Sequence, residues 1–284
     1  MSIPKIIHYC WFGGGAISPE NRKCMESWKK YCPDYKIIEW NDQNFDISTN
    51  RYAQQAYEAK KYAFVSDYVR LAVLYEYGGI YLDTDVELVR PLDELLELPG
   101  FMGFQTNNEV ATGLGFGARK GNSVVQALLR DYDALDFLKA DGSADLTPCP
   151  ERNTRVLQEL GVRKDGTRQS IAEMEIFPAE YFCPMDLYSR KLEAEAQRGQ
   201  PHFAAAAEKA LLYMVLPSAW PDRGTAEKEN LKTGAAARCC VAVLFLSRLP
   251  FARGNAILAQ DGVPIIFRQI KEIFACESDW LNFY

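Results

Sequence analysis

The sequence has 284 residues, of which 48% are hydrophobic and 25% charged, a composition that is typical of a folded enzyme and excludes a disordered tail. The net charge of −6 at pH 7, from 32 basic and 38 acidic residues, excludes a general nucleic-acid-binding surface. The longest apolar run, around Val241–Leu246, is far shorter than the roughly 18 residues of a membrane span, and Met1–Lys5 lacks the character of a secretory signal.

Strand-like and helix-like segments alternate from the start of the chain. Ile3–Trp11 is apolar and runs into three glycines, which predicts a strand followed by a loop. Glu20–Tyr31 is amphipathic with helical spacing, and Tyr35–Trp40 predicts a second strand. These segments indicate a β-α-β arrangement.

One long helix is predicted over Arg51–Tyr77, because apolar side chains recur at helical spacing between Phe64 and Tyr75. Gly78-Gly79 predicts its end, in the manner of a C-terminal glycine cap. Two short strands, Ile80–Leu82 and Val86–Val89, are expected next. We therefore expect an α/β fold with a mostly parallel central sheet flanked by helices.

The character of the chain changes after Lys191, where alanine becomes frequent and strand signals fade. The sequence therefore predicts two regions, residues 1–190 and a helical, divergent C-terminal region at 191–284. Lys232–Lys271 combines six basic residues and one acidic residue with many apolar ones. Since each basic residue near an anionic leaflet contributes about 1 kcal/mol, peripheral contact with the inner membrane face is one hypothesis. A helical subdomain with exposed arginines is the alternative.

The eight cysteines contain no C-x-x-C pair, and the chain has two histidines. A Cys/His zinc site therefore has almost no ligands available. Buried free thiols in a reducing compartment are the simpler interpretation. Together with the N-terminus, they lead us to expect a cytoplasmic protein.

Two carboxylates follow a short apolar strand in the segment Tyr77–Asp85. Asp83 and Asp85 are separated by one residue, and at a strand end both can meet one hard cation. Mg²⁺ and Mn²⁺ prefer oxygen ligands and are often held by one or two carboxylates together with substrate phosphates. The alternative is a solvated acidic turn.

Two further groups of polar and aromatic side chains are candidates. Ser66, Asp67 and Arg70 share the polar face of the predicted helix, where they offer an acceptor and a donor fork to vicinal hydroxyls. An ordinary surface ion pair is the alternative for Asp67 and Arg70. His8 and Trp11 end the first strand beside the glycine loop, where the indole could stack on a planar base or belong to the core.

Three of these segments together resemble glycosyltransferase family 32. Ile3–Gly14 is similar to its opening motif, and Phe64–Arg70 and Tyr77–Asp85 are similar to its two central motifs. Thr112–Gly117 and Glu180–Pro184 extend the resemblance, so that it spans about Ile3 to Asp186. The family includes bacterial capsular polysaccharide synthesis proteins, and the glucosyltransferase domains of the large clostridial toxins are distant relatives.

The resemblance implies a GT-A type nucleotide-sugar-binding fold over residues 1–190 and a retaining sugar transfer that uses Mn²⁺ or Mg²⁺. Asp85 looks like the direct metal ligand, with Asp83 beside it touching the donor ribose or sugar. Asp83, Asp85 and Arg70 are the expected catalytic residues. The residues that the resemblance assigns to donor binding are His8, Trp11, Ser66, Asp67, Arg70, Tyr81 and Asp83.

The C-terminal region departs from the family pattern, in which a segment resembling His-His-x-x-x-Ser-Trp closes the metal site. The nearest match is Pro201–Ala207, which keeps one histidine, His202, as a candidate third ligand. Proline replaces the other histidine, and alanine replaces serine and tryptophan. A divergent closing segment and an altered reading frame after Lys191 both account for this pattern.

The sequence therefore predicts an enzyme that moves a hexose from a UDP- or GDP-hexose to a hydroxyl of a capsule- or lipopolysaccharide-type glycan or lipid-linked glycan. A catalytically impaired nucleotide-sugar-binding protein is one alternative. A sugar nucleotidyltransferase is another, although Gly13-Gly14-Gly15 lacks an adjacent lysine or arginine for a triphosphate.

Overall fold

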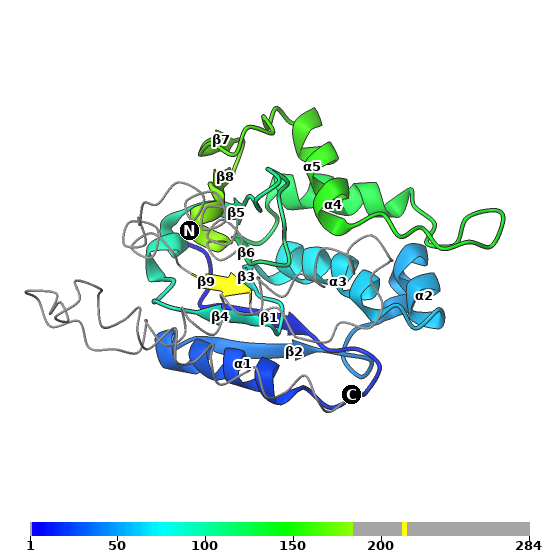
Figure 1. Cartoon of the computed structure of the whole chain (residues 1–284), viewed down its shortest axis with the longest axis horizontal. Helices are drawn as coiled ribbons and strands as arrows, with labels where there is room; N and C mark the ends of the chain where they lie inside the picture. Colours follow the sequence, from blue (N-terminus) through cyan, green and yellow to red (C-terminus); the bar gives the residue numbers. More distant parts are fainter. Residues whose placement is uncertain (1, 184–211, 215–284) are drawn as a thin grey trace, which may run out of the picture. The chain divides into compact units, whose positions relative to one another are not determined.

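The computed structural model of the chain describes residues 2–183 and 212–214. The main sheet has seven strands in the order β2-β1-β3-β6-β5-β8-β7 (Figure 1). Its strands are β1 (Ile6–Cys10), β2 (Lys36–Trp40), β3 (Gly79–Tyr81), β5 (Gly100–Gly103), β6 (Phe116–Ala118), β7 (Gln169–Ile171) and β8 (Met174–Phe177). Only β6 and β7 run against the other strands, because their pairings are antiparallel and the remaining three pairings are parallel. The prediction of a mostly parallel α/β sheet is confirmed.

Helices cover both faces of this sheet. They are α1 (Pro19–Tyr31), α2 (Arg51–Glu58), α3 (Tyr62–Tyr77), α4 (Ser123–Asp133), α5 (Cys149–Glu159) and α6 (Ala179–Phe182), with 3₁₀ turns at Ile47–Thr49 and Asp93–Glu97. Successive residues of a strand point to opposite faces: Tyr81 of β3 packs in one core cluster with Val69 of α3. Its neighbour Ile80 packs in the other cluster, with Trp28 of α1.

The predicted long helix over Arg51–Tyr77 is wrong in one respect, because it is two helices. α2 ends at Glu58 and α3 begins at Tyr62. Between them Lys60 adopts a left-handed backbone with φ 56°, and its N–H bonds back to the Tyr57 carbonyl at 2.9 Å. The local sequence Ala-Lys-Lys carries no glycine or proline to signal this break. The end of α3 is as predicted, since Gly78 has φ 66° and its N–H caps the Leu74 carbonyl.

A second, two-stranded sheet joins distant parts of the chain. β4 (Val86–Leu88) pairs antiparallel with β9 (Leu212–Met214), a strand that the fading strand signals after Lys191 did not predict. Helix α1 packs on β4, because the Trp28 indole N–H donates to the Val86 carbonyl at 2.8 Å. The rest of the predicted region 191–284 lies outside the described residues.

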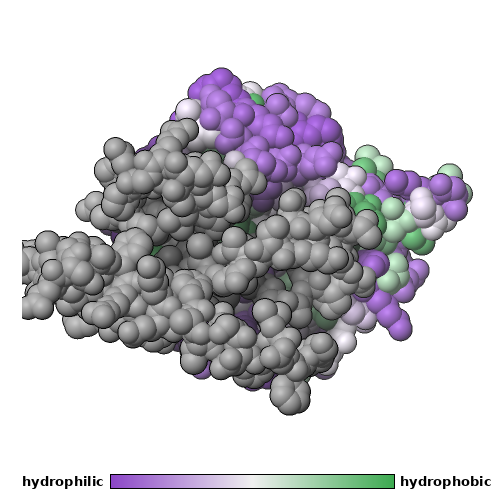
Figure 2. Space-filling model, in the orientation of Figure 1, coloured by the Kyte–Doolittle hydropathy of each residue, from purple (hydrophilic) through white to green (hydrophobic). Residues whose placement is uncertain are grey.

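The surface over α5 and β7 is largely hydrophilic in Figure 2. Large apolar side chains that are exposed among the described residues stand singly in the chain, at Tyr77, Leu138, Leu146 and Leu160. In this part of the chain, no helix has both the length and the apolar character that crossing a membrane requires.

The topology brings the sequence motifs to one edge of the sheet. β1 and β3 are parallel neighbours, so Trp11 and Asp83, which follow them, leave the sheet at the same edge. β6 is antiparallel to β3, and Phe116 pairs with Tyr81, so the residues just before β6 lie at this edge too. In open α/β sheets, ligands bind outside the carboxyl ends of the strands.

Candidate functional site

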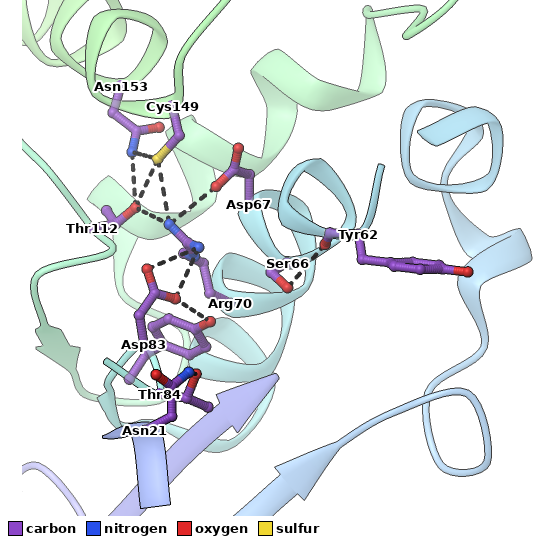
Figure 3. Close-up of polar contacts among 11 residues, drawn as sticks. Asn21, Tyr62, Ser66, Asp67, Arg70, Asp83, Thr84, Thr112, Cys149 and Asn153 are labelled. Atoms are coloured by element: carbon purple, nitrogen blue, oxygen red, sulfur yellow. Dashed lines mark hydrogen bonds and ion pairs between the residues drawn. The ribbon is translucent and has the colours of Figure 1, made fainter. Parts of the chain in front are cut away.

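Arg70 is the centre of a buried group of charged side chains. It lies on α3 with 4% of its surface exposed, and its guanidinium joins two carboxylates. Nη1 lies 3.1 Å from Oδ1 of Asp67, one turn earlier on the same helix. Nη2 lies 3.1 Å from Oδ1 of Asp83, which follows β3 (Figure 3). The surface ion pair considered from the sequence is therefore excluded, since Arg70 is buried and shared.

Tyr81 supports this arrangement from the sheet. Its hydroxyl donates to Oδ1 of Asp83 at 2.8 Å, and the Arg70 guanidinium lies over its ring, 5.0 Å from the centroid. Asp83 is the more exposed end of the group, with 28% of its side chain accessible against 12% for Asp67. A ligand that arrives at this edge therefore meets Asp83 first.

The electrostatics keep Arg70 charged and Tyr81 neutral. Burial alone would lower the pKa of Arg70, but the charges of Asp83 and Asp67 outweigh it and hold that pKa well above its ordinary value. Burial, followed by the charge of Asp83, raises the pKa of Tyr81 well above its usual range. Two carboxylates therefore share one guanidinium, which leaves an excess of negative charge at the carboxyl edge.

Three residues that the sequence analysis gave no role complete the surroundings of Arg70. Thr112 Oγ1 lies 3.4 Å and Cys149 Sγ 3.5 Å from Nη1. Asn153 Nδ2 donates to both, at 3.0 and 3.2 Å. Burial raises the pKa of the Cys149 thiol to about 12, so it stays protonated. Thr112 opens the Thr112–Gly117 motif, whereas no pattern in the sequence indicates a role for Cys149 or Asn153.

The acidic segment after β3 is a tight turn held by helix α1. The Val86 N–H donates to the Asp83 carbonyl at 3.0 Å, which closes the turn around Thr84 and Asp85. The buried Thr84 hydroxyl accepts a 2.8 Å hydrogen bond from Nδ2 of Asn21, a residue of α1. The turn between the two aspartates is therefore held in place by helix α1.

The donor set of this turn fits a hard divalent cation only in part. Among the described residues, no three His, Cys, Asp or Glu side chains are grouped to hold a metal ion. Asp83 already binds Arg70 and Tyr81, and His202 lies outside the described residues. Asp85 contributes a carboxylate, and Mg²⁺ or Mn²⁺ commonly completes such a site with substrate phosphate oxygens and water. The residues therefore fit a metal that binds together with a diphosphate.

Trp11 lies where the sequence places it, at the end of β1. Its indole N–H donates to the Gly15 carbonyl at 2.6 Å, which folds the glycine loop beside a half-buried ring. Gly13 has φ 83°, and a Cβ there would lie 2.2 Å from the Tyr62 ring, so the loop runs against the start of α3. Tyr62 itself points away from Arg70 (Figure 3).

His8 and Ser66 have their polar atoms engaged within the fold. The His8 ring is fully buried: Nδ1 accepts from the Trp40 indole at 3.0 Å, and Nε2 donates to the Gly78 carbonyl at 2.9 Å. The Ser66 hydroxyl donates to the Tyr62 carbonyl at 3.1 Å. His8 therefore offers no accessible nitrogen to a donor, and we place it with the residues that fix β1 against α3.

Most of this site lies in a segment of the chain that matches a known protein family. Residues 18–101 match the family described as "Glycosyltransferase sugar-binding region containing DXD motif". This segment contains Asp67, Arg70, Tyr81, Asp83 and Asp85. The resemblance drawn from the sequence is thereby confirmed at the level of a DXD-containing sugar-transferase region, whereas its narrower capsular type and its relation to the toxins stay predictions.

Three curated proteins illustrate the similarity. "Inositol phosphoceramide mannosyltransferase 3" of Schizosaccharomyces pombe is 30% identical over 151 residues, which cover 48% of this chain and 39% of that protein. "Mannosyl phosphorylinositol ceramide synthase SUR1" of Saccharomyces cerevisiae is 33% identical, covering 35% and 27%. "Uncharacterized glycosyltransferase L373" of Acanthamoeba polyphaga mimivirus is 26% identical, covering 66% and 76%. The chain thus spans well under half the length of the two yeast proteins.

Solved structures that resemble the chain carry glycosyltransferase titles. "PaToxG Glycosyltransferase" matches with a TM-score of 0.44 and 21% identity, over 73% of this chain and 84% of that one. The glycosyltransferase GlyE of Streptococcus pneumoniae matches with a TM-score of 0.42 and 12% identity, over 89% and 67%. Both scores are below 0.5, so the description of the fold rests on the strand order and helix packing given above.

Proposed function

We propose that this chain is a glycosyltransferase that binds a UDP- or GDP-hexose at the carboxyl edge of the sheet and transfers the hexose, with retention, to an acceptor hydroxyl. The observation that carries the proposal is the buried bridge from Asp67 through Arg70 to Asp83, next to Asp85. The family-matched residues 18–101 contain all four of these residues.

The proposed role of the bridge is to bind the hexose. A carboxylate accepts up to about four hydrogen bonds, and Asp83 accepts those of Tyr81 and Arg70 mainly on Oδ1. Its Oδ2 lies 3.5 Å from Nη2, which leaves capacity for a sugar hydroxyl. Since Arg70 and Tyr81 fix the carboxylate before a ligand arrives, little side-chain entropy remains to be lost on binding.

Asp85 is the proposed ligand of the divalent cation, Mn²⁺ or Mg²⁺. Such an ion, bound with the donor, neutralises the negative charge that develops on a departing diphosphate. The proposal is supported by the excess of carboxylates over guanidinium at this edge, which by itself repels an anionic donor. Trp11, at the same edge, is the proposed platform for the nucleotide base.

The proposed acceptor is based on the names of the relatives and on the sequence prediction. The yeast relatives are named for the mannosylation of inositol phosphoceramide, a lipid, and the sequence predicts a capsule-, lipopolysaccharide- or lipid-linked glycan. We propose a hydroxyl of a lipid-linked glycan as the acceptor class, with residues 1–190 as the catalytic domain. Lys232–Lys271 is the segment proposed to contact the inner membrane face, and it lies outside the described residues.

A screen of nucleotide sugars tests this function. Thermal unfolding of the full chain is followed with UDP- and GDP-hexoses, with and without Mn²⁺, and the stabilising donors are then assayed for metal-dependent hydrolysis. We expect one donor class to raise the unfolding temperature only with the metal. Stabilisation without hydrolysis would favour the alternative, a nucleotide-sugar-binding protein. No stabilisation by any donor would overturn the proposal.

A further inference from the structure

The step from Thr112 to Gly113 lies against both members of the Arg70–Asp83 ion pair. Thr112 is fully buried, and its Oγ1 is 3.4 Å from Arg70 Nη1. A Cβ built on Gly113 would lie 2.4 Å from Asp83 Oδ2 and 3.4 Å from Arg70 Nη1. One short segment before β6 therefore touches the guanidinium through a hydroxyl and the carboxylate through bare backbone.

The hydroxyl of Thr112 is oriented from helix α5. Its Oγ1 accepts an N–H from Asn153 at 3.0 Å and one from Arg70. Since these occupy both lone pairs of the oxygen, the hydroxyl hydrogen is directed to Cys149 Sγ, 3.2 Å away. Figure 3 shows these contacts converging on the side of Arg70 that faces away from Asp83. Arg70 is thus held at Nη1 by Asp67 and Thr112 together and at Nη2 by Asp83.

Space, rather than backbone conformation, requires the glycine at position 113. Gly113 is absent from the positive-φ glycines of the described residues, so its backbone accepts an L side chain without strain. The contact of 2.4 Å is shorter than any that real Cβ atoms make. An alanine therefore has to push the Asp83 carboxylate away from its place beside Arg70.

We propose that Thr112 and Gly113 are positioning residues of the donor site, which set the direction of the Arg70 guanidinium and seat the Asp83 carboxylate against it. This inference rests on the proposed function for the ligand, a hexose whose hydroxyls bind Asp83. It gives a role to the Thr112–Gly117 motif. The two residues act through Arg70 and Asp83, and the nucleotide part of the donor does not depend on them.

The first test compares Thr112→Val with Thr112→Ser. Valine keeps the shape and removes the hydroxyl, whereas serine keeps the hydroxyl and removes a methyl group. A hydrogen bond to a charged group corresponds to about a 10-fold change in affinity. We expect Thr112→Val to raise KM for the nucleotide sugar by about 10-fold, with little change in binding of the nucleoside diphosphate. Thr112→Ser should stay within about 3-fold of the wild type.

The second test uses Gly113→Ala, with Gly100→Ala as its matched control. A Cβ at Gly100 would also be crowded, because it would lie 2.8 Å from the Met174 side chain. Gly100 belongs to β5, and its crowded neighbour is not Asp83. Thermal unfolding is measured for each alanine variant alone and combined with Asp83→Ala. We expect Gly113→Ala to lower the unfolding temperature of the wild type and to lose most of this effect once Asp83 is alanine. The effect of Gly100→Ala should be the same in both backgrounds.

The two tests separate this inference from the proposed function. If the wild type binds a nucleotide sugar and Thr112→Val binds it equally well, the inference is overturned and the function stands. If the wild type binds no nucleotide sugar, the function fails and the donor role of these residues fails with it. In either case, Gly113→Ala should lower the unfolding temperature less when Asp83 is alanine. An equal decrease in both backgrounds would overturn the claim that Gly113 seats the Asp83 carboxylate against Arg70.

Discussion

The guanidinium of Arg70, on helix α3, lies 3.1 Å from Oδ1 of Asp83, in the turn after β3. The two residues are 13 positions apart and come from two different sequence motifs. Their ion pair joins the helix to the acidic turn, because the buried charge of Arg70 needs carboxylate partners. Asp67 and Tyr81 belong to the same group of contacts.

Two substitutions of Arg70 separate the effect of its charge from the effect of its planar guanidinium. Arg70→Met leaves two carboxylates without their shared cation, and breaking a buried pair costs about 3–5 kcal/mol of stability. Arg70→Lys keeps the charge but loses the planar fork. We expect the lysine variant to fold and to bind the nucleotide sugar at least about 10-fold more weakly, with nearly unchanged affinity for the nucleoside diphosphate. Urea unfolding and competition binding measure the two effects.

An equal loss of nucleotide and nucleotide-sugar affinity in Arg70→Lys would contradict this role. It would indicate that Arg70 contacts phosphate or that the fold is damaged. Unfolding curves for the same variant distinguish these two causes.

Asn21 is predicted to control the acidic turn from helix α1. Its Nδ2 donates to Thr84 Oγ1, between the two aspartates, so Asn21→Ala releases one anchor of the turn. Because the lost bond is between neutral groups and half-buried, we expect a cost of about 1 kcal/mol in stability. Donor affinity in the presence of Mn²⁺ should fall by up to about 5-fold, which is this cost converted to a binding constant. Lys23→Ala, on the same helix, is the control.

Equal metal-dependent donor affinity in Asn21→Ala and Lys23→Ala would show that the turn does not need the Asn21–Thr84 hydrogen bond. The contacts of Val86 with Asp83 and Trp28 would then be enough to hold the turn.

His8 predicts a specific dependence of stability on pH. Burial lowers its pKa from 6.5 to about 4. As the pH falls from 6.5 toward 4, His8 becomes protonated in the unfolded chain but stays neutral in the folded protein. The free energy of unfolding therefore decreases over this pH range. Between pH 7 and 4.5, His8 should account for about 2–3 kcal/mol of that loss. His8→Gln removes the titrating group.

The free energy of unfolding in urea, measured at pH 7 and 4.5, tests this prediction. The wild type should lose about 2–3 kcal/mol more than His8→Gln over this interval. Equal losses in the two proteins would contradict the buried, neutral imidazole.

The sequence predicted the parts of the fold that local patterns determine. The strand Ile6–Cys10, the helix Pro19–Tyr31 and the glycine cap at Gly78 match their patterns, because apolar period and cap chemistry are local properties. The break at Lys60 was missed, since a lysine and not a glycine has the left-handed backbone between α2 and α3.

The candidate site was predictable residue by residue but not as a set of contacts. Helical spacing paired Asp67 with Arg70, and this pair is present. The sequence could not show that Arg70 also reaches Asp83, because that contact depends on how α3 packs on β3. Nor could it show that His8 is buried: a histidine at a strand end fits a ligand site and a core equally well.

The central claim is that Asp85 binds a divalent cation together with a nucleotide sugar beside the Arg70–Asp83 pair. Isothermal titration with the stabilising donor, with and without Mn²⁺, tests it in the wild type, in Asp85→Asn and in the control Asp133→Asn at the end of α4. We predict metal-dependent binding in the wild type and the control, and its loss in Asp85→Asn, because an amide supplies no charge. Asp83→Asn should retain part of the metal affinity while losing the sugar. Unchanged affinity and metal dependence in Asp85→Asn would contradict the claim.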